Sequence, residues 1–229
     1  MHLLDLIFPK RCVGCGKVGK YFCNRCTSII QIIEVNEAIC PVCEKPAIDG
    51  KTHPKCQTRY AIDGLTSFFH YDGPIRKAVK AIKYRYVSDL SREFIRLIPS
   101  SYLNKVAMQQ FRNVMLVPVP LHPSRLRFRG FNQAEVLGKL LAARLPIPIQ
   151  TNVLMRVKKT TAQVEMKDKK ERLQNVEGVF SILSSTMNHK GSTVFLFDDV
   201  FTTGATMRSA ASVLKHAGAK FVWGITMAR

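Results

Sequence analysis

The sequence contains no cysteine after Cys56, although seven cysteines lie between Cys12 and Cys56. This odd number, with most cysteines spaced as C-x-x-C, argues against a disulfide framework. The chain also lacks any apolar run of the roughly 18 residues that a membrane-spanning helix requires. Its first residues, MHLLDLIFPKR, carry Asp5 within the apolar part and place the basic residues after it, unlike a secretory signal. We therefore expect a cytoplasmic protein with no integral membrane segment.

Acidic residues are scarce: 16 Asp and Glu stand against 35 Lys and Arg, which gives a formal net charge of +19 in 229 residues. The remaining composition, with 46% hydrophobic and 22% charged residues, is that of an ordinary globular protein. A strong positive charge attracts polyanions such as nucleic acids, phosphate ligands or an anionic membrane surface. The alternative is a basic surface that serves only solubility.

The seven cysteines and one histidine form four short pairs, each with two residues between its members. Eight ligands make two complete sets for tetrahedral zinc and leave no position for water, so two structural zinc ions are expected. A segment this small needs the metal in order to fold. Sequential pairing gives two compact ribbons, and a cross-braced pairing is the alternative. In sequential order the ligands are Cys12, Cys15, Cys23 and Cys26, then Cys40, Cys43, His53 and Cys56.

Beyond residue 60, continuous apolar segments alternate with segments of helical periodicity. This pattern predicts an α/β fold, a mostly parallel sheet with helices on both faces. We expect a zinc-binding double ribbon over residues 1–60 and the α/β domain over residues 61–229. In such sheets ligands bind at the carboxyl ends of the strands, so the candidate site lies after Val119 and Phe197. The expected strands are 65–71, 114–119, 153–157, 176–182, 193–197 and 221–226, and the expected helices are 74–84, 132–145 and 206–217.

The segment VFLFDDVFTTGAT, residues 194–206, places two adjacent acids before a turn of small residues at a helix start. Such a turn can direct backbone amides and hydroxyls at a phosphate. Asp198 and Asp199 would repel a phosphate, but they can accept hydrogen bonds from hydroxyls or hold a divalent cation. A 5-phosphorylated ribose suits both parts of the segment, because its hydroxyls can bind the two acids and its phosphate can bind the turn. The alternative interpretation is an ordinary helix start with two capping acids. The turn consists of Thr202, Thr203, Gly204, Ala205 and Thr206.

The sequence argues against two other classes of phosphate-handling protein. The chain has no G-x-x-x-x-G-K-[ST] motif, which excludes a P-loop nucleoside triphosphatase. Phosphatases of the haloacid-dehalogenase type carry D-x-D at a strand end, and here the two aspartates are adjacent.

The segment resembles the phosphoribosyl pyrophosphate signature of type I phosphoribosyltransferases, and the whole chain resembles the ComF family of competence proteins. The wider similarity includes Ile82-Lys-Tyr84, Val117-Pro-Val-Pro120, Arg127-Phe-Arg-Gly-Phe-Asn-Gln133 and residues 163–180. It implies a type I phosphoribosyltransferase-like domain in which Asp198 and Asp199 contact the ribose as the catalytic pair. The turn at 202–206 would hold the 5-phosphate, with magnesium bound alongside phosphoribosyl pyrophosphate. His53 departs from the cysteine that relatives often carry, but zinc accepts either residue.

The resemblance also implies a pyrophosphate-binding loop after the strand at 114–119 and a flexible basic loop within residues 156–172. The first includes Pro118 and Val119 and is followed by Arg125. Their basic neighbours can bind phosphates of a small ligand or of a nucleic-acid backbone, and a solvated charge run is the alternative. The candidate nucleic-acid residues are Arg127, Arg129, Lys158, Lys159 and Lys167.

Two functional hypotheses follow from this resemblance. The first is a protein of natural transformation that handles incoming single-stranded DNA in the cytoplasm, with a competence helicase as partner, and binds phosphoribosyl pyrophosphate or a related ribose phosphate. The second is an active phosphoribosyltransferase that displaces pyrophosphate in favour of an unidentified acceptor. A metabolic accessory role outside competence is a weaker third hypothesis.

Overall fold

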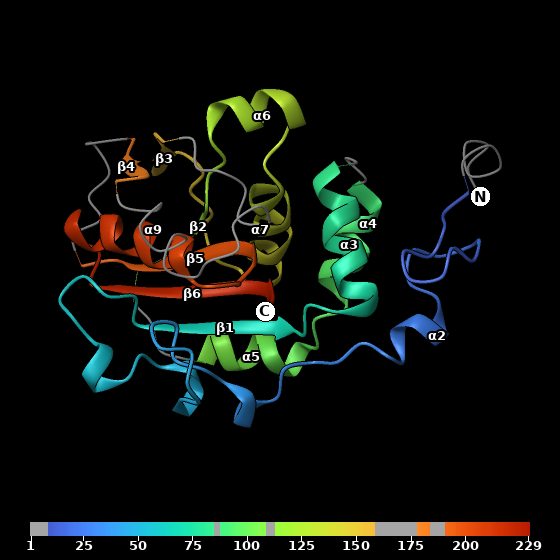
Figure 1. Ribbon diagram of the computed structural model, residues 1–229, viewed down its shortest axis with the longest axis horizontal. Coiled ribbons are helices and arrows are strands. Elements are labelled where there is room, and N and C mark those ends of the chain that lie inside the picture. Colours follow the sequence, from blue (N-terminus) through green and yellow to red (C-terminus); the bar gives the residue numbers. More distant parts are fainter. Residues whose placement is uncertain (1–8, 85–87, 109–112, 159–177, 184–190) are drawn as a thin grey trace.

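The computed structural model describes residues 9–84, 88–108, 113–158, 178–183 and 191–229. At its centre lies a parallel four-stranded sheet in the order β1-β6-β5-β2 (Figure 1). A separate antiparallel pair is formed by β3 and β4. These features confirm the predicted α/β fold with a mostly parallel sheet. The strands are β1 (Gly64–Phe69), β2 (Val114–Pro118), β3 (Leu154–Arg156), β4 (Phe180–Ile182), β5 (Thr193–Val200) and β6 (Phe221–Ala228).

Strand β5 is apolar on both sides because helices cover both faces of the sheet, as predicted. Phe195 and Phe197 belong to a core shared with α3, α4 and α7. Val194 and Leu196, which point to the opposite face, belong to a second core shared with α9. The helices are α3 (Gly73–Tyr84), α4 (Ser88–Arg96), α5 (Ser100–Met108), α6 (Pro123–Arg129), α7 (Gln133–Arg144) and α9 (Ala205–His216).

The observed elements differ from the expected ones in two places near the candidate site. Strand β5 continues through Asp198 and Asp199 to Val200, because it pairs with β6 over this length. The acidic pair therefore lies in the end of a strand rather than in a loop. The residues after β2 also form a helix, α6, which the sequence analysis does not predict. The start of the expected strand 176–182 falls on residues 176 and 177, which lie outside the described residues.

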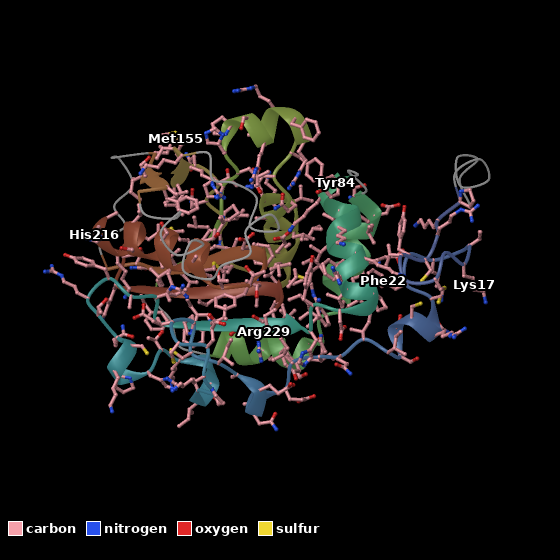
Figure 2. All side chains as sticks on the ribbon, in the orientation of Figure 1. Lys17, Phe22, Tyr84, Met155, His216 and Arg229 are labelled. Carbon is pink, nitrogen blue, oxygen red and sulfur yellow. The ribbon has the colours of Figure 1, made fainter. Side chains whose placement is uncertain are left out.

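The cysteine-rich segment forms two separate ribbons that pack against different parts of the α/β domain. Ribbon 1, residues 10–28, lies beside α3 and α4, where Phe22 stacks on Phe94 at 6.1 Å between ring centroids (Figure 2). In ribbon 2, residues 38–57, Ile39 and Val42 pack against the core that contains α9. The short helices of this segment are α2 (Asn24–Thr27), η1 (Val35–Glu37), η2 (Ile48–Gly50) and η3 (Pro54–Cys56).

The chain around the ribbons also contacts the outer edge of the sheet. Strand β1 is the outermost strand on this side, and Ile32 and Lys51 form single antiparallel bridges with Phe69 and Gly64, at the two ends of β1. Both bridges cover backbone groups that would otherwise be free on the edge strand.

Candidate functional site

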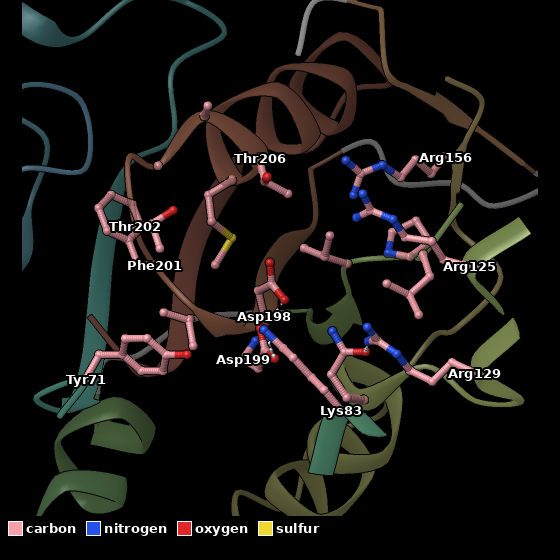
Figure 3. A pocket seen from close by; sticks show the side chains of 18 of the residues that line it. Tyr71, Lys83, Arg125, Arg129, Arg156, Asp198, Asp199, Phe201, Thr202 and Thr206 are labelled. Carbon is pink, nitrogen blue, oxygen red and sulfur yellow. Dashed lines mark hydrogen bonds and ion pairs between the residues drawn. The ribbon is translucent and has the colours of Figure 1, made fainter. Parts of the chain in front are cut away.

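A pocket of about 650 Å³ opens at the carboxyl ends of the neighbouring strands β2 and β5 (Figure 3). Its walls come from the end of β5, the turn before α9, the segment after β2 with α6, and the end of α3. The two segments singled out from the sequence, after Val119 and after Phe197, therefore line one pocket. This is the place where an open parallel sheet binds ligands.

The acidic pair lies in the middle of this pocket and is partly neutralised by a lysine. Asp199 is buried, with its side chain 6% exposed, and its Oδ2 lies 2.9 Å from Nζ of Lys83 at the end of α3. The backbone amide of Asp199 donates to Oδ1 of Asp198 at 2.8 Å. Burial and the negative charge of Asp199 raise the pKa of Asp198 from 3.8 to about 7, although Lys83 acts in the opposite direction. Two adjacent carboxylates with one nearby lysine leave a site that favours a further cation or hydroxyl donors.

The turn before α9 forms the wall on one side of the acids (Figure 3). Gly204 precedes α9 with φ of 67°, a left-handed conformation that favours glycine. Thr202, Gly204, Ala205 and Thr206 line the pocket, and the last two begin α9, where backbone amides have no partner within the helix. Thr203 lies outside the lining, and its buried Oγ1 has no hydrogen-bond partner among the described residues. The turn thus lies at a helix start, a position at which proteins can bind anions.

Arginines form the opposite wall, as Figure 3 shows. Arg125 and Arg129, four residues apart on α6, both line the pocket, and Arg129 donates to Gln133 Oε1. Arg127 is exposed and does not line the pocket, because residues two apart on a helix point in different directions. Arg156 at the end of β3 completes this wall. The three pocket arginines can bind a polyphosphate by charge-assisted hydrogen bonds.

Five other predicted residues do not offer a clear contact to a ligand in this pocket or lie outside the described residues. Val119 lines the pocket, but its backbone amide donates to Phe197 O and its carbonyl accepts from Asn132, so its peptide groups serve the scaffold. Pro118 ends β2 and does not line the pocket. Lys158 is exposed just after β3. Lys159 and Lys167 lie outside the described residues.

Ribbon 1 brings four thiols together. The Sγ atoms of Cys12, Cys15, Cys23 and Cys26 lie within 4.8 Å of one another, and Cys15 and Cys23 are 3.7 Å apart. A zinc ion bound at about 2.3 Å by four sulfurs places them about 3.8 Å apart, whereas a disulfide needs about 2.05 Å. Gly14 has no room for a side chain here, since a Cβ would lie 2.6 Å from Cys26 Sγ. The cluster fits a structural zinc ion.

Ribbon 2 repeats this arrangement with a histidine. Cys40, Cys43, His53 and Cys56 form the second cluster, which confirms the sequential grouping preferred from the sequence. His53 Nδ1 lies 3.3 Å from Cys43 Sγ, and His53 Nε2 lies 2.9 Å from the carbonyl oxygen of Pro46. A proton on Nε2 satisfies that carbonyl and leaves the Nδ1 lone pair for the metal. The histidine therefore serves as a ligand equivalent to a cysteine.

Several pocket residues escaped the sequence analysis. Lys83 lies in Ile82-Lys-Tyr84, which the resemblance includes, but no role was predicted for it, because it belongs to the same polar side of the helix as Lys77 and Lys80. Tyr84 and Phe128 also line the pocket, and they are 75% and 88% exposed. In the sequence Phe128 stands between two arginines, and this pattern could have indicated a binding residue.

Comparison with known proteins agrees with this architecture. A family model described as a double zinc ribbon domain matches residues 3–57, and one described as a phosphoribosyl transferase domain matches residues 132–228. The chain is 30% identical over 222 residues to Competence protein F of Haemophilus influenzae, covering 95% of this chain and 90% of that protein. It is 27% identical over 217 residues to Competence protein ComFC of Bacillus subtilis, covering 88% and 81%. It is 26% identical over 208 residues to DNA utilization protein YhgH of Salmonella typhimurium, covering 86% of each.

The fold and the zinc clusters thus define a phosphoribosyltransferase-type domain joined to an N-terminal double zinc ribbon. The chain belongs to the ComF/ComFC family of competence proteins. In the described part of the chain, no helix has the length and apolar character needed to cross a membrane.

Proposed function

We propose that the pocket binds phosphoribosyl pyrophosphate or a related ribose phosphate. The observation that supports this most directly is the order of charges across the pocket: a helix start, then two carboxylates, then arginines. A ligand with a phosphate at one end, a diol in the middle and a pyrophosphate at the other end matches this order. Thr202 to Thr206 receive the 5-phosphate, Asp198 and Asp199 the ribose hydroxyls, and Arg125 and Arg156 the pyrophosphate.

Magnesium accompanies the ligand in this proposal. Asp198 is the carboxylate suited to it, because Asp199 already pairs with Lys83. The raised pKa of Asp198 reflects a charge that the protein alone does not compensate. A bound divalent ion supplies that compensation and neutralises the pyrophosphate.

Calorimetric titration with phosphoribosyl pyrophosphate, with and without magnesium, tests the pocket. We expect binding by the wild type and its loss in Asp198→Asn/Asp199→Asn. Asp89→Asn is the matched control, because Asp89 lies on α4 with its side chain 48% exposed in a surface ion pair with Lys10. Equal affinity in the double variant and the wild type would show that the acids do not bind the ribose.

We further propose that the protein handles single-stranded DNA in the cytoplasm during natural transformation. The names of its relatives and the net charge of +19 support this role. Helix α6, which projects beyond the sheet in Figure 1 and contributes residues to the pocket lining, adds a surface for it. Arg127 and Phe128 on α6 are exposed, and Tyr84, labelled in Figure 2, lies at the end of α3 with Arg129 5.9 Å from its ring centroid. Exposed aromatic rings beside arginines bind single strands by base stacking and phosphate contacts.

Fluorescence anisotropy with labelled single strands over a range of salt concentrations tests this role. Arg127→Ala should weaken binding and reduce the slope of log affinity against log salt by about 0.7, the value for one phosphate contact on a single strand. Phe128→Ala should weaken binding by about 1–3 kcal/mol and leave the slope unchanged, because stacking releases no counterion. Arg92→Ala, which removes an exposed arginine of α4, is the control. Absence of binding at low salt contradicts the proposal.

A second candidate function is transfer of the phosphoribosyl group to an acceptor. The presence of Tyr84 and Phe128 in the lining favours it, since the pocket extends from the acids to two aromatic rings that could hold an acceptor ring. In this reaction the bond from ribose C1 to pyrophosphate breaks, a bond from C1 to the acceptor nitrogen forms, and the nitrogen loses its proton. Release of pyrophosphate that depends on both an added acceptor and Asp198 would demonstrate it.

A further inference from the structure

Arg208 connects the turn at the pocket to ribbon 2. It lies in the first turn of α9, and its backbone amide donates to Gly204 O at 2.9 Å. Its Nη1 donates to Pro41 O, also at 2.9 Å. Pro41 is the residue that follows the zinc ligand Cys40 in the pair Cys40–Cys43. One side chain therefore joins the start of α9 to the backbone between two metal ligands.

The packing around Gly204 makes this connection tight. A Cβ added to Gly204 would lie 2.5 Å from the ring of Phe201 and 2.7 Å from Arg208 Nη1. The ring and the guanidinium thus both lie close against Gly204, and Phe201 and Gly204 both line the pocket. A guanidinium that leaves its place must change the surroundings of the turn, because a close-packed interior does not deform continuously.

An apolar contact supports the same connection. Val42, which lies between Cys40 and Cys43, packs against the core cluster that includes Ala205 and Met207 of α9. Both of these residues also line the pocket. The zinc-binding turn and the pocket wall thus share one packed core.

We propose that zinc in ribbon 2 fixes the turn at the pocket through Pro41 O and Arg208, so that zinc occupancy and ligand affinity are thermodynamically linked. The metal holds Cys40 and Cys43 in place and thereby sets the direction of the carbonyl between them. Without the metal the carbonyl is free to turn, and Arg208 loses its acceptor. Linkage is reciprocal, so a ligand in the pocket must in turn strengthen zinc binding in ribbon 2. The identity of the ligand rests on the function proposed above, whereas the connection between ribbon and turn does not.

Ribbon 1 provides an internal control. Lys77 Nζ donates to Gly14 O at 2.6 Å, so ribbon 1 also offers a carbonyl between two zinc ligands to a basic side chain. Lys77, however, is exposed, lies in the first half of α3 and does not line the pocket. Its loss should leave the turn before α9 unchanged.

Equilibrium competition for zinc with the chromogenic chelator 4-(2-pyridylazo)resorcinol tests the linkage. In the wild type, phosphoribosyl pyrophosphate with excess magnesium should raise the affinity for one of the two zinc ions by about fivefold or more, the lower end of typical coupling. Arg208→Met should keep both zinc ions, bind the ligand more weakly and lose this increase in zinc affinity. Arg208→Lys should retain part of it, and Lys77→Met should behave as the wild type. An increase of wild-type size in Arg208→Met overturns the proposal.

A second measurement needs no ligand and separates this proposal from that of the pocket's function. Hydrogen exchange of backbone amides 202–208 should be faster in Arg208→Met and in Cys43→Ser, which removes a ligand of ribbon 2. It should be unchanged in Cys15→Ser, which removes a ligand of ribbon 1. If the exchange rates at 202–208 are the same in Cys43→Ser as in the wild type, the proposal is overturned. If exchange responds as expected but phosphoribosyl pyrophosphate does not bind the wild type, only the proposed function is wrong.

Discussion

Lys83 and Asp199 form an ion pair across the pocket, with Nζ 2.9 Å from Oδ2 and the aspartate side chain only 6% exposed. Burial acts to lower the pKa of Lys83, but the charge of Asp199, the hydrogen bond to it and the charge of Asp198 together outweigh burial and raise that pKa above its ordinary value. The lysine therefore stays charged and engages one acid of the pair. Asp198 is left as the carboxyl group that a ligand can use.

Lys83→Met should destabilise the protein at pH 8 by about 2–3 kcal/mol. Removing one partner leaves the other charge buried and uncompensated, a change that costs about 3–5 kcal/mol in fully buried pairs. The expected loss is smaller because the Lys83 side chain is 27% exposed. Urea unfolding measures it, and Lys83→Met/Asp199→Asn should recover most of the stability. Strictly additive effects of the two changes would contradict a direct pairing.

Asp198 should make the protein less stable as the pH rises towards neutrality. Its pKa is about 7 in the folded protein and near 3.8 in the unfolded chain, so the folded state retains the proton longer. The free energy of unfolding therefore falls between about pH 4 and 7, by up to about 1.4 kcal/mol per pH unit, and is level above pH 7. Asp198→Asn removes this dependence.

Urea unfolding of the wild type and Asp198→Asn from pH 5.5 to 8 tests this prediction. Both proteins contain the same zinc ribbons, whose own pH dependence cancels in the difference. The stability of the variant relative to the wild type should increase up to about pH 7 and then stay constant. A difference that is the same at every pH would show that Asp198 titrates normally.

Gly14→Ala should disrupt ribbon 1. The added Cβ would lie 2.6 Å from Cys26 Sγ, which is closer than atoms can approach, so the thiol must move out of its position for the metal. We expect the zinc content to fall from two ions towards one, measured by atomic absorption. Gly16→Ala is the control, because its φ of 80° makes alanine strained but its Cβ meets no atom within 4 Å. That variant should keep both ions and lose about 1 kcal/mol of stability.

Lys215→Met should cost about 3 kcal/mol of stability, whereas Lys139→Met should cost less than about 0.5 kcal/mol. Both lysines lie 2.6 Å from a carboxylate oxygen, Lys215 from Asp63 and Lys139 from Glu135. The first pair is buried, with side chains 8% and 12% exposed, and the second is largely exposed. Denaturant unfolding compares the two directly, and equal losses would contradict the role of burial.

The fold class and the zinc ligands could be predicted because their signals are local. Strands buried on both faces are continuous apolar runs, and His53 has the spacing of the cysteine that it replaces. The end of β5 was missed because Asp198 and Asp199 interrupt the apolar run, although pairing with β6 continues to Val200. Here tertiary pairing overrides local composition.

The sequence of α6 contains residues typical of helix boundaries, but the alternating arginines at 125, 127 and 129 drew attention away from them. His122 caps it by accepting from the amide of Ser124, Pro123 begins it, and Gly130 follows it with φ of 79°. These are ordinary helix boundaries, so α6 was predictable. The resemblance includes the segment of Lys83, but its ion pair with Asp199 was not predictable, because only the approach of α3 to the end of β5 distinguishes Lys83 from the other lysines of its helix. Contacts between distant segments leave no local pattern.

The bridges of Ile32 and Lys51 to the two ends of β1 have a consequence for solubility. An outer strand with unpaired backbone groups is a template on which a second copy can add its own strand. Backbone hydrogen bonds from Ile33 to Phe68 and from Thr52 to Asp63 hold the covering segments in place, and the ribbons anchor them. Removal of the first 60 residues would therefore expose a template for self-association. Zinc binding keeps these segments folded over β1 and thereby also protects the protein from aggregation through this edge.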